Sequence, residues 1–131
     1  MKRSLAKTLT TIQQMDLIEE NLYKKENTFF YNLNEEQKFE EPKFYELMVF
    51  IKHLSDKISD TDRPLKANQI WELCFHIQRE LTYHCNKSDL VEIKPITESE
   101  IASIGNIMFY VANFFTYKKE IEINFIPLDN W

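Results

Sequence analysis

Hydrophobic residues recur at intervals of three and four along four stretches of the chain, the spacing that gathers them on one face of an α-helix. This pattern predicts helices over residues 4–25, 42–58, 65–85 and 97–117. Pro42 suits the first turn of the second helix, because an N–H group would be unpaired there. Thr97 and Glu100 have the spacing of a capping box at the start of the fourth helix.

The third and fourth predicted helices each carry a feature that bears on packing. In the third helix, the inward-facing stripe consists of Ile70, Cys74, Ile77 and Leu81. In the fourth, Gly105 lies in the helix interior, where glycine costs roughly 1 kcal/mol relative to alanine. We expect the close approach of another helix to compensate for that cost.

Two short stretches alternate between apolar and polar residues instead, as strands do. They cover residues 91–94 and 121–126. The second stretch either pairs with the first as a short β-strand pair, lies along the helices, or adds to the sheet edge of a partner. The pattern leaves these alternatives open.

Composition narrows the fold class. The 131 residues include one Gly and four Pro, and an all-β fold needs more turn residues than that. The length fits one domain with a real core, and the chain has no repeat and no interdomain linker. We therefore expect a mainly α single domain over residues 1–131, built like a four-helix bundle.

The charge and the cysteines of the chain indicate which kind of partner and which cellular compartment to expect. The formal charge of −5 and the pI near 5.2 argue against binding to nucleic acid through phosphate neutralisation, and they suit a basic protein partner. No apolar run is long enough for a membrane span, and no apolar region follows the basic N-terminal residues, so we expect a cytoplasmic protein. Cys74 and Cys85 would lie about 16 Å apart on one helix, beyond disulfide reach, and are expected to be free thiols.

The third predicted helix holds Glu72, His76, Glu80 and His84 at intervals of four. Carboxylate and imidazole groups at this spacing can ligate a divalent metal. Successive members of such a row drift by about 40° around the helix, so the four side chains do not converge on one ion. We expect a solvated face with Glu–His pairs, and neither a metal ion nor another cofactor.

Arg79 and His84 have an Arg-x4-His spacing. This pair resembles the motif of the HEPN ribonucleases, small helical domains that pair across a dimer to cut RNA. The resemblance implies that Arg79 and His84 would polarise the phosphate and help to move the proton of the 2′-hydroxyl, without a metal. That family typically has Asn, Asp or His after the arginine, where this chain has Glu80, and on an unbroken helix Arg79 and His84 are about 140° apart.

Carboxylates cluster at two places, each beside the end of a predicted helix. One group is Glu35, Glu36, Glu40 and Glu41, and the other is Asp56, Asp60 and Asp62. Aromatic side chains are expected at half-exposed positions, namely Tyr23, Tyr31, Tyr45, Tyr83, Tyr110, Tyr117 and Trp131. Acidic groups steer a basic partner during its approach, and aromatic side chains supply anchoring area. Charged loops are also common on helical proteins with no such partner.

In length, acidity and richness in Ile, Asn, Lys and Phe, the chain resembles the immunity proteins of bacterial toxin–immunity systems, including those of contact-dependent growth inhibition. No motif carries the resemblance. It implies a non-enzymatic inhibitor that binds a basic toxin, a nuclease domain, and covers its substrate cleft with carboxylates that mimic phosphates. The seven carboxylates named above are the candidate partner-binding residues. The alternatives, in order, are a helical adaptor or assembly subunit and the ribonuclease that would use Arg79 and His84.

Overall fold

The structure, a computed structural model, describes residues 17–85 and 97–118, without the side chains of residues 84 and 85. The described residues form helices α2 (Leu17–Leu22), α3 (Phe29–Glu35), α4 (Glu41–Lys57), α5 (Arg63–Cys85) and α6 (Glu98–Tyr117). None of these helices is both long enough and apolar enough to cross a membrane. The stretches expected to alternate as strands, 91–94 and 121–126, lie outside the described residues, as does the first part of the predicted helix 4–25.

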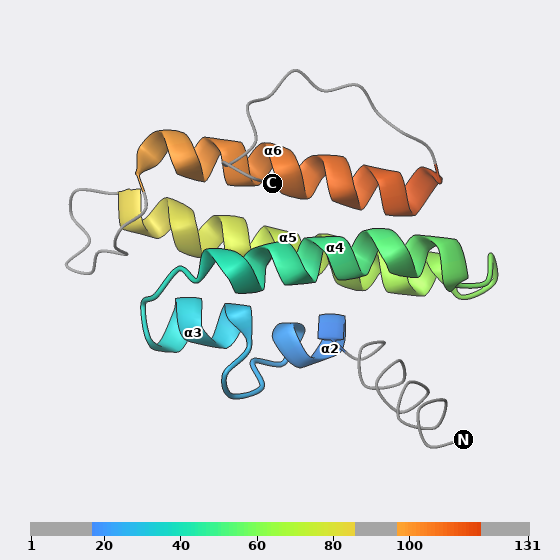
Figure 1. The fold of residues 1–131 in the computed structure, drawn as a ribbon, viewed down its shortest axis with the longest axis horizontal. Coiled ribbons are helices and arrows are strands. Elements are labelled where there is room, and N and C mark those ends of the chain that lie inside the picture. Colours follow the sequence, from blue (N-terminus) through green and yellow to red (C-terminus); the bar gives the residue numbers. More distant parts are fainter. Residues whose placement is uncertain (1–16, 86–96, 119–131) are drawn as a thin grey trace.

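The helices pack as a bundle in which α4 and α5 form the middle (Figure 1). Helix α6 packs against both of them from one side, and the short helices α2 and α3 pack against both from the other side. Helix α5 runs opposite to α4 and α6. The prediction of a mainly α, bundle-like fold is confirmed, with the fourth column of the bundle made of two short helices.

The predicted apolar stripes meet in one core. Its fully or almost fully buried members on the three long helices are Phe44, Leu47, Met48, Ile51, Leu54, Ile70, Leu73, Ile77, Leu81, Ile104, Ile107, Met108, Val111 and Phe115. From α2 and α3, the core receives Ile18, Phe29, Phe30 and Leu33. Burial of this apolar area is the main force that holds the helices together.

Gly105 lies where α6 passes α5. A Cβ atom at this position would lie 2.7 Å from the Oε1 atom of Gln78 on α5, which is closer than such atoms approach in proteins. The atoms that a Cβ would meet all belong to the end of the Gln78 side chain, so the neighbour of Gly105 is a flexible side chain of α5 and not the helix backbone.

Helix α3 was not expected, because its sequence is a short aromatic run between asparagines. Polar side chains start it. The Thr28 hydroxyl accepts a hydrogen bond from the Tyr31 N–H at 3.3 Å, and Asn21 of α2 accepts one from the Phe30 N–H at 2.9 Å. Both N–H groups belong to the first turn of a helix, where the backbone supplies no acceptor. The predicted first helix also ends earlier than expected, at Leu22.

Arg63 is the first residue of α5 and is buried, with 6% of its surface exposed. Its guanidinium donates to the hydroxyl and carbonyl of Ser55 at 3.0 and 2.7 Å, and to the carbonyl of Phe115 at 2.8 Å. Ser55 and Phe115 lie in the last turns of α4 and α6. The last carbonyls of a helix have no N–H partner within the helix, and they carry partial negative charge. The Arg63 guanidinium therefore supplies donors to a carbonyl at the end of α4 and to one at the end of α6.

We predict that Arg63→Ala lowers the free energy of unfolding by about 3 kcal/mol, because buried carbonyls lose a charged donor. Urea denaturation followed by circular dichroism measures this change. Lys38→Ala removes an exposed cation and serves as the control, with an expected change within about 0.5 kcal/mol. Equal stability of the two variants would contradict the role of Arg63.

Candidate functional site

The two predicted acidic groups lie at opposite ends of α4. Glu35, Glu36, Glu40 and Glu41 lie between the end of α3 and the start of α4, whereas Asp56, Asp60 and Asp62 lie at the end of α4 and in the turn before α5. At a rise of about 1.5 Å per residue, Glu41 and Asp56 are roughly 22 Å apart along the helix axis. The seven carboxylates therefore form two surfaces rather than one.

The first group borders a shallow hollow of about 470 Å³. Its lining residues are Glu26, Asn27, Tyr31, Asn32, Glu36, Lys38 and Glu40. Three carboxylates, one lysine and one tyrosine thus face a common space. Glu26 was not among the predicted residues. It joins the others because the chain turns back between α2 and α3, which the sequence pattern did not indicate.

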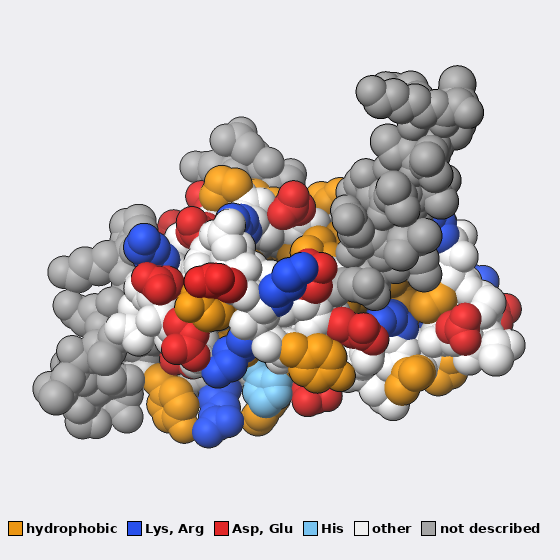
Figure 2. Space-filling view, turned by 90° about the horizontal axis from the view of Figure 1, so that it is seen from below, with side chains coloured by type: hydrophobic (Ala, Val, Ile, Leu, Met, Phe, Trp, Pro, Cys, Tyr) orange, Lys and Arg blue, Asp and Glu red, His pale blue; other side chains and the backbone are white. Residues whose placement is uncertain are grey.

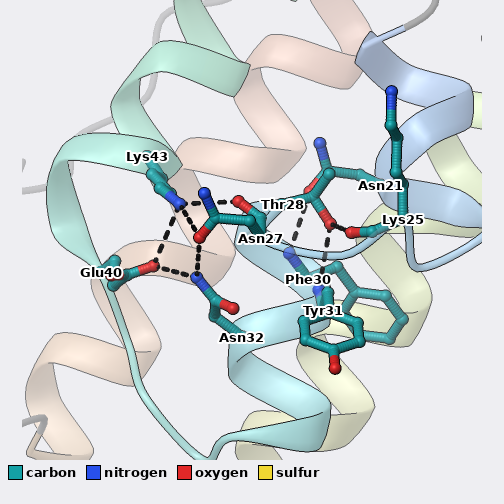
Figure 3. Close-up of polar contacts among 9 residues, drawn as sticks. All are labelled: Asn21, Lys25, Asn27, Thr28, Phe30, Tyr31, Asn32, Glu40 and Lys43. Atoms are coloured by element: carbon teal, nitrogen blue, oxygen red, sulfur yellow. Dashed lines mark hydrogen bonds and ion pairs between the residues drawn. The ribbon is translucent and has the colours of Figure 1, made fainter.

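A polar network holds one wall of this hollow (Figure 3). Lys43 donates to the backbone carbonyl and the side-chain oxygen of Asn27 at 2.6 and 2.9 Å, and lies 3.6 Å from a carboxylate oxygen of Glu40. The Asn32 amide donates to Glu40 and to Asn27. Asn27 itself has a left-handed backbone, with φ at 70°. The network fixes Glu40 and the turn that carries Glu26.

The carboxylates of the first group and Glu26 differ in whether another side chain already pairs with them. Glu35 lies 3.2 Å from the ammonium of Lys24, and Glu41 accepts a hydrogen bond from the Tyr45 hydroxyl at 2.9 Å. Glu26 and Glu36 are exposed and make no ion pair with any side chain in the described ranges. Of the carboxylates that line the hollow, these two are therefore the ones whose charge is not taken up by an ion pair within the described ranges, and Lys38 lines the same space.

The second group is partly neutralised. A carboxylate oxygen of Asp60 lies 3.4 Å from the ammonium of Lys118 and 3.8 Å from the Nε atom of Arg63. Asp56 and Asp62 are exposed. Within the described ranges these two carboxylates make no ion pair, so the compensation at this end of α4 is confined to Asp60.

The carboxylates and histidines spaced by four along α5 do not share one partner. His76 lies 3.6 Å from Glu72, whereas Glu80 turns to α3 and accepts a hydrogen bond from the Asn34 amide. Among the described residues, no three potential metal-ligating side chains are grouped. The expected Glu–His pairing is seen for Glu72 and His76, and the side chain of His84 lies outside the described part of the structure.

Arg79 lines a second hollow, of about 430 Å³, between α3 and α5. Lys24, His76 and Glu80 also line it, and Figure 2 shows Lys and Arg side chains gathered beside a histidine on this face of the molecule. The Arg79 guanidinium lies over the Tyr83 ring and donates to its hydroxyl at 3.3 Å. Arg79 thus contacts its own helix, and its relation to the His84 side chain lies beyond the described residues.

The aromatic surface is larger than the sequence indicated. Of the expected residues, Tyr23, Tyr83 and Tyr117 are exposed, Tyr31, Tyr45 and Tyr110 are partly exposed, and Trp131 lies outside the described residues. Trp71, Phe75 and Phe109 are exposed as well, although they were not predicted. The sequence did indicate that Phe75 is exposed, because on a helix it lies about 130° from the buried stripe of Ile70, Cys74, Ile77 and Leu81.

Cys74 belongs to the core, as its place on the apolar stripe predicted. Burial raises the pKa of its thiol to about 12, because a thiolate would lose its hydration there. A thiol with so high a pKa is protonated at neutral pH and is a poor nucleophile. Cys74 is therefore a structural residue and not a candidate for nucleophilic catalysis.

No protein-family model matches the chain, and neither a curated protein nor a solved structure shows significant similarity to it. The geometry of its surface is therefore the basis for a functional assignment.

We predict that Cys74 is protected from thiol reagents in the folded protein. In a Cys85→Ser variant, which leaves Cys74 as the one remaining cysteine, modification at pH 8 should be at least roughly a hundredfold slower in the native state than in guanidinium. The absorbance of a released chromogenic thiol follows both reactions. Equal rates would show that Cys74 is accessible in the native state.

Proposed function

We propose that this protein is a non-enzymatic inhibitor that binds a basic protein partner, an immunity protein that neutralises a toxin nuclease by covering its substrate cleft. The observation that supports this proposal is the acidic hollow of Glu26, Glu36 and Glu40 between α3 and α4. It offers several carboxylates in a concave site, together with the ring of Tyr31.

The chemistry of a nuclease cleft suits such a site. A cleft that holds phosphates presents Lys and Arg side chains, and carboxylates can take the place of the phosphates. Glu26 and Glu36 suit this role because they make no ion pair among the described residues, so a partner's cation would not displace an existing one. The net charge of −5 would also accelerate the approach of a basic partner.

The second acidic group has a lesser part in this proposal. Lys118 and Arg63 already lie beside Asp60, so a partner that binds there displaces existing contacts. Exposed ion pairs contribute little, and replacing one by another gives a small net gain. The carboxylates of the acidic hollow also share a concave site with the Tyr31 ring, so we place the centre of the interface there and the group of Asp56, Asp60 and Asp62 outside it.

Two charge-reversal variants test this assignment. We expect Glu26→Lys/Glu36→Lys to weaken binding of the partner at least about tenfold, because like charges then face each other. Asp56→Lys/Asp62→Lys is the matched control, with an expected change within about threefold. Both variants change the formal charge from −5 to −1, so a difference between them reports position and not net charge.

The measurement has two parts. The tagged full chain is purified from its native host at about 0.15 M salt, and the affinity of the retained partner is then measured for each variant by calorimetry. The nuclease activity of that partner is assayed with and without the protein. A basic partner whose nuclease activity is suppressed supports the proposal. A partner without such activity would favour the adaptor alternative, and the absence of any partner would contradict both.

A further inference from the structure

An aromatic patch lies on the outer surface of α5 and α6, away from the acidic hollow. It consists of Trp71 and Phe109, 36% and 52% exposed, and of Phe75, 63% exposed. Phe75 lies one turn after Trp71 on α5, and its ring also meets that of His76, with the centroids 5.8 Å apart. The Trp71 and Phe109 rings meet edge to face, with their centroids 6.1 Å apart. The indole N–H of Trp71 donates to the Thr116 hydroxyl at 2.9 Å, which holds the ring in place. Grouped exposed aromatic side chains on a folded domain indicate an interaction site.

Two opposite charges flank the patch on α5. Glu72 precedes Phe75 by three residues and Arg79 follows it by four. Around the helix axis, Glu72 lies about 60° from Phe75 and Arg79 about 40°, both in the same direction. Both side chains are exposed. Their contacts in the structure are with residues of the same helix, His76 at 3.6 Å from Glu72 and Tyr83 at 3.3 Å from Arg79.

We propose that a second copy of this chain covers the aromatic patch, with the two α5 helices antiparallel across a two-fold axis near Phe75. The two-fold axis lies between the helices and is perpendicular to both. Side chains on one side of the Phe75 row therefore stay on that side in both copies, while the residue order of the partner subunit runs in the opposite direction. Glu72 then lies beside Arg79 of the partner subunit, and the symmetry repeats this pair. The two Phe75 rings meet at the axis.

The charge pattern selects this arrangement. In a parallel pairing, each Glu72 would lie at the level of Glu72 of the partner subunit, and no opposite charges would meet. The antiparallel pairing gives two charge-complementary contacts on one flank of the apolar centre. An interface with an apolar centre and a charged rim is typical of associating proteins. The acidic hollow lies between α3 and α4, so the dimer would present it twice.

The association is measured on the full chain by sedimentation velocity over a wide range of concentrations. We expect the wild type to pass from the 15.8 kDa monomer to twice that mass as concentration rises. Phe75→Ser should raise the dissociation constant roughly a hundredfold, because each dimer loses the side chain twice. Tyr117→Ser is the matched control. It removes an aromatic side chain of similar exposure, 62%, that lies off the patch, and it should leave the constant unchanged.

A charge exchange tests the geometry. Glu72→Arg alone should weaken the dimer about tenfold, because arginines then face each other across the axis. Glu72→Arg/Arg79→Glu should restore the constant to within about threefold of the wild type, because the pairs re-form with exchanged signs.

Three results would overturn the proposal. They are a wild type that stays monomeric at every concentration, an equal effect of Phe75→Ser and Tyr117→Ser, and a failure of the charge exchange to restore association. A monomeric wild type would assign the patch to a different protein. None of these results bears on the acidic hollow, which the charge reversals at Glu26 and Glu36 test separately.

Discussion

The buried guanidinium of Arg63 is the interaction on which the arrangement of the long helices depends. It joins the start of α5 to the last turns of α4 and α6 through Ser55 and Phe115. A planar group with several donors can do this, whereas a lysine offers a single compact charge. Because three helices meet at one side chain, their relative rotation is fixed at this end. That rotation determines which faces of α5 and α6 point outward.

Much of the bundle could be predicted because it follows from local patterns. The apolar stripes located the long helices, the capping box at Thr97 formed as expected, with the Glu100 N–H 3.2 Å from the hydroxyl, and Gly105 marked a contact with a side chain of α5. Helix α3 could not be predicted in this way. Its first turn depends on Asn21, a residue of another helix. Arg63 was equally hidden, since a charged residue in a polar break of the sequence resembles a surface turn.

The candidate site could be predicted only in outline. Sequence spacing located the clusters of carboxylates, but their free charge depends on cations that are distant along the chain. Lys24 compensates Glu35 across a turn, and Lys118 compensates Asp60 from the far end of α6. Glu26 entered the site through a left-handed turn at Asn27, whose conformation no periodicity reveals. Such pairings are long-range properties of the fold, whereas the clusters themselves are properties of the sequence.

The polar network of Lys43, Asn27, Asn32 and Glu40 has a consequence for the rate of binding. It orders the wall of the hollow in the free protein, so little backbone entropy remains to be lost when a ligand side chain enters. A preorganised site associates without a slow conformational step, and differences in affinity among its ligands then appear in the rate of dissociation. If the proposed inhibition of a nuclease holds, such a site would let the protein occupy the cleft without first rearranging.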